Sequence, residues 1–351
     1  MKILVTGNEG YIGSILVPML KEAGHEVRGY DTALFRECAL TPFDRPPTIR
    51  KDIRDAEAGD IEGVDAIIHL AGLANDPLGD LDPPVTYAIN HEATVRLAEL
   101  AKKAGIQRFL YASTCSVYGA AGEDMIDEET APNPVTPYAR SKIMSEEDLL
   151  KLVGDDFCPV FLRAATAYGV SPYLRFDLAL NNLVAWAYTT KQVYLKSDGL
   201  SWRPLVHIRD IARGYMTLLT APKEKVCARA FNIGSSEENY RIVRLAELVR
   251  DGVPGSTLTH AADASPDKRS YRVSCDLIKQ TLPEYQTTWT AARGIDEVYQ
   301  VVRGSGLNAK DFEGERYNRI AHVRSLIEGD KLSTNLRWTE PAMLDQVSVE
   351  Q

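Results

Sequence analysis

The chain has 351 residues, with 49 acidic and 40 basic side chains and a formal net charge of −9. This length suits one large α/β unit or two domains, and the acidic balance argues against a nucleic-acid-binding surface. The five cysteines form no CxxC pair, so we expect no metal site. No apolar run reaches the roughly 20 residues of a membrane span and no secretory leader is predicted, so we expect a cytoplasmic protein.

Short apolar strands alternate with helical segments through the first half of the chain. Strands are predicted at 3–5, 27–30, 66–70, 109–112 and 160–162, and helices at 12–23, 86–104 and 137–153. Because strands that alternate with helices pair in parallel, the sequence predicts an α/β fold with a doubly wound, Rossmann-type parallel sheet.

The alternation breaks after residue 163. Helices are predicted at 176–188 and 241–249, and strands at 193–195 and 230–233; the charged segment 307–338 is expected to be mostly helical, without an assigned role. We therefore expect a first domain at 1–165, with a returning segment at about 203–234. A smaller, interleaved domain is expected at 166–202 and 235–340, followed by a loose tail at 341–351.

A glycine-rich turn joins the first strand to the first helix. Gly7, Gly10 and Gly13 form G-x-x-G-x-x-G, with Tyr11 and Ile12 inside the turn. The first glycine allows a tight turn, the second lets a pyrophosphate approach the backbone, and the third lets helix and strand pack closely. With a strand before it and a helix N-terminus after it, this turn predicts dinucleotide binding.

An acidic residue ends the second strand. Asp31 can accept the ribose hydroxyls of NAD and would repel a 2′-phosphate, so NAD is favoured over NADP. Asp52 and Ile53 follow the expected third strand and are candidates to lie beside the adenine.

A tyrosine and a lysine share one face of the helix that begins near residue 137. Tyr138 and Lys142 are four residues apart, and a nearby ammonium is expected to lower the tyrosine pKa, which suits a general acid/base. Ser113 and Thr114 end the strand before it, at the edge where doubly wound sheets bind ligands, so a hydroxyl there can contact a reacting oxygen.

Together these motifs resemble the extended short-chain dehydrogenase/reductases, in the NAD-dependent epimerase/dehydratase group that acts on nucleotide sugars. The resemblance extends to about residue 276. It implies that Thr114, Tyr138 and Lys142 are catalytic. It also implies that Leu70, Ala71, Gly72 and Asn90, as well as Tyr138 and Lys142, help to bind the cofactor.

The substrate half matches the family pattern less well. Thr166, Asn182, Leu183, Arg203 and Arg269 occupy the positions of substrate-binding residues, with Thr166 in place of the usual Asn. The two arginines suit a nucleotide diphosphate. Thr114 is itself expected to contact the substrate.

The residues after Thr114 narrow the reaction. Related 4,6-dehydratases carry Asp-Glu there and decarboxylases carry Glu, whereas this chain has Cys115 and Ser116. The sequence therefore predicts an NAD-dependent nucleotide-sugar epimerase, with C4 as the expected carbon. The alternatives are an NAD(P)-dependent 4-ketosugar reductase or sugar alcohol dehydrogenase and, less favoured, a non-catalytic NAD-binding regulator. The resemblance also implies a homodimer.

Overall fold

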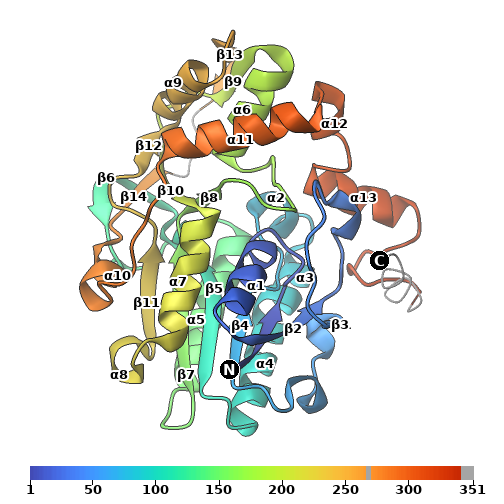
Figure 1. The fold of residues 1–351 in the computed structure, drawn as a ribbon, viewed down its shortest axis with the longest axis vertical. Coiled ribbons are helices and arrows are strands. Elements are labelled where there is room, and N and C mark those ends of the chain that lie inside the picture. The colour runs from blue at the N-terminus through green and yellow to red at the C-terminus, as the bar shows by residue number, and fades with distance from the viewer. Residues whose placement is uncertain (266–269, 341–351) are drawn as a thin grey trace.

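The computed structural model describes residues 1–265 and 270–340. Seven parallel strands form its central sheet, in the order β11-β7-β5-β4-β1-β2-β3 (Figure 1). They are β1 (Lys2–Thr6), β2 (Glu26–Asp31), β3 (Thr48–Arg50), β4 (Ala66–His69), β5 (Arg108–Thr114), β7 (Cys158–Ala164) and β11 (Arg229–Ile233). This confirms the doubly wound parallel sheet that the sequence predicts.

Helices cover both faces of the sheet, because alternate side chains of a strand point to opposite faces. Ile3 and Val5 belong to the core beneath α1 (Gly13–Glu22) and α7 (Ile208–Thr220), whereas Leu4 belongs to the core on the other side. That second face is covered by α4 (Ala93–Lys103) and α5 (Pro137–Lys151), whose inward residues include Leu97 and Leu149.

The segment before α4 is less regular than the single helix predicted at 86–104. It consists of α3 (Pro83–Tyr87) and a π-helical turn (Ala88–Glu92) that runs directly into α4. The π-helical turn lies against α5. It contains the buried Asn90, which reaches the loop after β4.

A second lobe lies over one edge of the sheet (Figure 1). Its helices α6, α9 and α11 pack on one another, and three small sheets, β12-β10-β8, β13-β9 and β14-β6, lie outside the central sheet. The elements are β6 (Ala120–Ile126), β8 (Thr166–Tyr168), α6 (Ala179–Thr190), β9 (Gln192–Ser197), β10 (Trp202–His207), β12 (Asn239–Arg241), α9 (Ile242–Gly252), β13 (Thr257–Ser265), β14 (Ser270–Val273) and α11 (Ala291–Ser305). Of the predicted returning segment, α7 and β11 rejoin the central sheet, whereas β10 pairs with β8 and β12.

The C-terminal segment lies elsewhere than predicted. Only α12 (Ala309–Glu313) and α13 (Arg319–Glu328) are helical between 307 and 338. Val323, Leu332 and Leu336 are buried in the core on the α4 side of the first domain, although the sequence assigned them to the second domain. The reason is that these apolar side chains complete a core whose buried residues outside this segment lie more than 150 positions earlier in the chain.

Short helices complete the described structure: α2 (Asp76–Gly79), α8 (Lys223–Val226) and α10 (Asp276–Thr281). Among the described helices, none combines the length and apolar character needed to span a membrane.

Candidate active site

A pocket of about 430 Å³ opens at the carboxyl edge of the central sheet, near the point where the strand order reverses between β1 and β4. In doubly wound sheets this is the position where ligands bind. It is bordered by most of the residues that the sequence singled out, namely Gly7, Gly10, Tyr11, Ile12, Gly13, Asp31, Asp52, Ile53, Leu70, Ala71, Gly72, Thr114, Tyr138, Lys142, Thr166 and Arg203.

The glycine turn has no room for a side chain at Gly7 or at Gly13. Gly7 has a φ of +70°, and a Cβ on it would lie 2.8 Å from the backbone nitrogen of Ala71. A Cβ on Gly13 would lie 2.4 Å from the Gly7 carbonyl oxygen and 2.6 Å from the Cα of Asn8. Glycine is therefore required at both positions, by the backbone conformation at the first and by close packing at both.

Asp31 lies at the end of β2 with its carboxylate held by the backbone. It accepts hydrogen bonds from the Glu9 nitrogen (2.9 Å) and the Ala33 nitrogen (2.8 Å). Burial, and next the negative charge of Glu9, raise the pKa of Asp31 to about 6. Glu9 itself pairs with Arg50 and Arg45. Asp31 is thus still ionised at neutral pH, although its charge is costly.

Buried hydrogen bonds fix the loop after β4 against the glycine turn. His69 lies between the hydroxyls of Thr6 (2.7 Å) and Thr94 (2.8 Å), and burial lowers the pKa of His69 to about 3, so its ring is neutral. The Thr6 hydroxyl also accepts a hydrogen bond from the Ala71 nitrogen at 3.2 Å. The glycine turn and the loop after β4 are therefore joined through side-chain hydrogen bonds.

Asn90 supports this loop from behind rather than lining the pocket. Its Oδ1 accepts a hydrogen bond from the Leu73 nitrogen (2.8 Å), and its Nδ2 donates to the Leu73 carbonyl (3.1 Å). A Cβ on Gly72 would lie 2.8 Å from Asn90 Oδ1, so the amide and the loop are closely packed. Asn90 therefore shapes this part of the pocket wall indirectly.

The helix α5 brings Tyr138 and Lys142 to the pocket. Thr136 caps the helix by accepting a hydrogen bond from the Ala139 nitrogen at 3.2 Å. Lys142 is 5% exposed, and its Nζ donates to the Ala112 carbonyl at the end of β5 (2.9 Å). Burial lowers the pKa of Lys142 to about 8.

The tyrosine differs from the sequence-based expectation. We expected the ammonium of Lys142 to lower the pKa of Tyr138, but burial raises it to about 12, and a hydrogen bond with Thr114 offsets only part of this rise. The reason is that burial penalises the phenolate, while Lys142 Nζ lies over the ring face, 5.9 Å from its centroid. Without a further positive charge, Tyr138 therefore stays protonated at neutral pH.

The residues after Thr114 face in different directions. The Thr114 hydroxyl accepts a hydrogen bond from the Ser116 nitrogen (3.1 Å), and Thr114 and Ser116 both border the pocket. Cys115 is 1% exposed, its thiol donates to the Arg163 carbonyl (3.1 Å), and burial raises its pKa well above the usual range. Cys115 is thus a packed thiol, unsuited to proton transfer.

A buried ion pair between α5 and β7 was not predicted from the sequence. Glu146 and Arg163 are 3% and 6% exposed, with 2.6 Å between Glu146 Oε2 and Arg163 Nη2. The Ser113 hydroxyl also donates to Glu146. Glu146 follows Lys142 by one helical turn and opposes the lowering of the lysine pKa. Ser113 and Thr114 both border the pocket, but the Ser113 hydroxyl is bonded to this pair, whereas Thr114 forms a hydrogen bond with Tyr138.

The predicted substrate residues separate into three groups. Thr166 and Arg203 border the pocket. Asn182 donates to the Phe176 carbonyl (2.8 Å) and Leu183 is buried in the apolar core of the second lobe, so both lie outside the pocket wall, contrary to expectation. The inward face of α6 holds them there, since its apolar residues pack against α9 and α11. Arg269 lies outside the described residues.

Some pocket residues carry no signal in the sequence. Arg175 and Asp177 form a salt bridge (2.5 Å) in the loop after β8, and Arg319 begins α13. All three border the pocket, as does Tyr271. They belong to no motif and come from distant parts of the chain, so only the tertiary structure brings them to the pocket that the glycine turn also borders.

Comparison with known proteins agrees with this geometry. Residues 3–234, which include the glycine turn, Tyr138 and Lys142, match the model of the NAD dependent epimerase/dehydratase family. The chain belongs to this family. Its members are NAD-dependent enzymes of the extended short-chain dehydrogenase/reductase type.

Relatives in other organisms are sugar-nucleotide epimerases by name. The uncharacterized UDP-glucose epimerase YtcB of Bacillus subtilis (strain 168) is 32% identical over 278 residues, covering 75% of this chain and 85% of the relative. The UDP-glucose 4-epimerase of Homo sapiens is 26% identical over 337 residues, covering 85% and 94%.

Solved structures share the fold. The UDP-glucuronic acid 4-epimerase from Bacillus cereus, in complex with UDP-glucuronic acid and NAD, has a TM-score of 0.70 and 25% identity and covers 87% of this chain and 99% of its own. MoeE5 in complex with UDP-glucuronic acid and NAD has a TM-score of 0.75 at 24% identity, covers 87% and 100%, and supports the fold alone.

Proposed function

We propose that this enzyme is an NAD-dependent nucleotide-sugar epimerase that inverts C4. The observation that carries the proposal is that Thr114, Tyr138 and Lys142 meet the glycine turn in one pocket. NAD, when bound, would serve first as the hydride acceptor and later as the hydride donor. The protein must then remove and restore one hydroxyl proton and hold the sugar while its face changes.

Tyr138 is the residue proposed to take the sugar hydroxyl proton. Its hydrogen bond with Thr114 places two hydroxyls at one point of the pocket wall, where a sugar oxygen can bind to both. Because burial raises the tyrosine pKa to about 12, proton removal needs positive charge nearby. Lys142, over the same ring and mostly protonated at neutral pH with its pKa near 8, does not offset burial by itself, so a further positive charge must come with the bound ligands.

Dehydration is disfavoured by the residues around Thr114. The side chain that follows it, Cys115, is buried, and Ser116 offers only a hydroxyl to the pocket. A carboxylate does lie near Tyr138 and border the pocket, that of Asp76, which accepts a hydrogen bond from Thr136 at 2.7 Å. Elimination of water would need an acid and a base at the neighbouring carbons, so loss of water serves as a test of the proposal.

A nucleotide diphosphate is the proposed anchor of the substrate. Arg203 is 8% exposed, lies over the Tyr271 ring at 5.8 Å and borders the pocket on the side of the second lobe. A guanidinium there can hold diphosphate oxygens in a bidentate manner, which would let the sugar turn while the nucleotide stays bound.

The test is to incubate UDP-glucose or UDP-glucuronic acid with the enzyme and a catalytic amount of NAD. Proton NMR reports the C4 configuration, absorbance reports NADH, and mass spectrometry reports loss of water. Inverted C4 without net NADH is the expected result. Conversion of the added NAD to NADH without an epimer would instead indicate a dehydrogenase or reductase, and a product lighter by one water would indicate a dehydratase; either would overturn the proposal.

We also propose that the enzyme forms a homodimer through α5. This helix exposes Met144 (36%) and Leu150 (44%) on its outer surface, and apolar side chains there would gain from burial. Analytical ultracentrifugation of the native protein and of a Met144→Lys/Leu150→Lys variant tests this. A native monomer, or a dimer that the variant leaves intact, would contradict it.

A further inference from the structure

Arg319 is a charged pocket residue that the family motifs do not include. It is the first residue of α13, more than 300 positions after the glycine turn, yet it borders the same pocket. Its guanidinium stacks over the ring of Phe35 at 4.3 Å, and Phe35 lies in the loop that follows Asp31. The C-terminal segment therefore contributes a positive charge to the cofactor half of the site.

Among the residues that the structure describes, no carboxylate forms a salt bridge with Arg319. The nearby Asp177 is engaged by Arg175, through hydrogen bonds of 3.0 Å from Nε and 2.5 Å from Nη2. Burial, and next the positive charge of Arg175, lower the pKa of Arg319 to about 10. A guanidinium in a pocket is costly unless an anion balances it, so the arrangement favours an anionic ligand.

The C-terminal segment that contains Arg319 is hydrogen-bonded to the loop after β2, on one side of the region where we place the adenosine of NAD. Trp338 Nε1 donates to the Thr32 carbonyl (2.9 Å), and the ring of His322 lies 3.0 Å from the Leu34 carbonyl oxygen. Both carbonyls belong to the loop after β2. The C-terminal segment is thus attached to the loop that carries Phe35.

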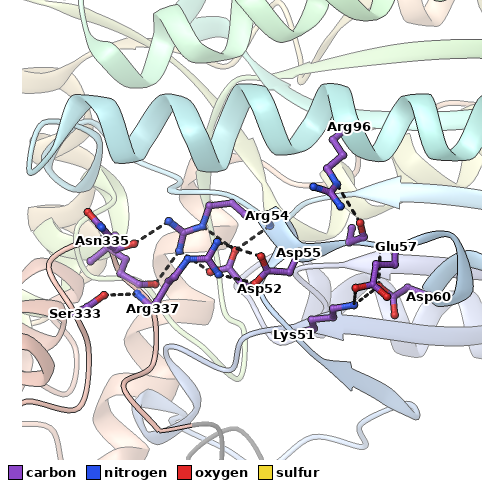
Figure 2. Close-up of polar contacts among 12 residues, drawn as sticks. Lys51, Asp52, Arg54, Asp55, Glu57, Asp60, Arg96, Ser333, Asn335 and Arg337 are labelled. Atoms are coloured by element: carbon purple, nitrogen blue, oxygen red, sulfur yellow. Dashed lines mark hydrogen bonds and ion pairs between the residues drawn. The ribbon is translucent and has the colours of Figure 1, made fainter.

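On the other side of that region, the same segment is bonded to Arg54 and Asp55, which follow β3 (Figure 2). Arg54 donates to the Asn335 carbonyl (2.8 Å) and the Leu336 carbonyl (3.2 Å), and Arg337 pairs with Asp55. Arg54 also binds Asp52, one of the predicted adenine-side residues, through its Nε at 2.9 Å. Leu336, 7% exposed, borders the pocket. The segment 319–339 is therefore a built part of this wall.

We propose that Arg319 binds the pyrophosphate of NAD and that the segment 319–339 forms one wall of the cofactor site. A planar guanidinium matches two phosphate oxygens, and the glycine turn offers backbone donors to the same group. The ribose 2′ position is excluded as the target, because a phosphate there would meet Asp31 and Glu9. The inference rests on the cofactor and is independent of which sugar reacts.

The test measures binding to the full-length protein after removal of copurified nucleotide. Calorimetric titration gives Kd for NAD and ADP-ribose, and saturation-transfer NMR gives binding of adenosine, which lacks phosphate. Arg319→Met keeps an unbranched stem over Phe35 and removes the charge. Arg324→Met, on an exposed position of the same helix, is the matched control.

Arg319→Met should weaken NAD and ADP-ribose about 10- to 100-fold, the range of a charged hydrogen bond, and leave adenosine binding unchanged. Arg319→Lys should recover part of the loss, and Arg324→Met should bind as the native protein does. Unchanged NAD affinity in Arg319→Met, or an equal loss for adenosine, would overturn the proposal, since the second result means that only packing was disturbed. Because no sugar nucleotide is present, failure of the epimerase assay does not affect this result.

Discussion

Asp31 is expected to destabilise the ligand-free enzyme while it selects the cofactor. Its pKa rises from 3.8 to about 6 on folding, so the folded state opposes ionisation. For a raised carboxyl pKa, the cost is absent below pH 3.8, grows between the two values and is complete above 6. At one pKa unit per 1.36 kcal/mol, the cost is at most about 3 kcal/mol near pH 7.5 and about half of that near pH 5.

Asp31→Asn removes the charge but keeps a single acceptor oxygen, so it can retain only one of the two hydrogen bonds, that from the Glu9 nitrogen to Oδ2 or that from the Ala33 nitrogen to Oδ1. Because the lost bond offsets about 1 kcal/mol of the relieved charge cost, we expect ligand-free Asp31→Asn to be more stable than the native protein by about 1–2 kcal/mol near pH 7.5, with a smaller gain near pH 5. Urea unfolding at both pH values measures this, with the exposed Asp80→Asn as the control. Calorimetry should also show a narrower preference for NAD over NADP. A loss of stability, or a gain of equal size at both pH values, would refute the reasoning.

The other predictions concern catalysis, the glycine turn and the buried ion pair. Tyr138→Phe should lower turnover about 100- to 10,000-fold and leave NAD affinity nearly intact; steady-state kinetics that retain most of the turnover would remove its acid/base role. Gly13→Ala should weaken NAD at least about tenfold by calorimetry, because its Cβ would overlap backbone, whereas Gly59→Ala, with open space around it, should not. Glu146→Gln should cost about 3–5 kcal/mol of unfolding free energy in urea, since it leaves Arg163 buried without a counter-charge; a change below about 1 kcal/mol would show that the pair contributes little.

The sequence by itself determined the parts of the site that depend on local geometry. Gly7 and Gly13 are required by a turn only a few residues long, and Tyr138 and Lys142 share a helix face because they are four apart. The role of Asp31 is predicted from its position at the end of one strand. Each of these relations depends on neighbouring residues, so a pattern in the chain predicts it.

Only the tertiary structure decided which distant groups meet and how burial changes their chemistry. Asn182 and Leu183 fit a motif, but the inward face of α6 holds them outside the pocket wall. Tyr138 has a raised pKa because burial outweighs the nearby charge, a balance that spacing does not reveal. Arg319 borders the same pocket as the glycine turn because apolar side chains of the C-terminal segment complete the core beside α4, and that packing depends on contacts between residues far apart in the sequence.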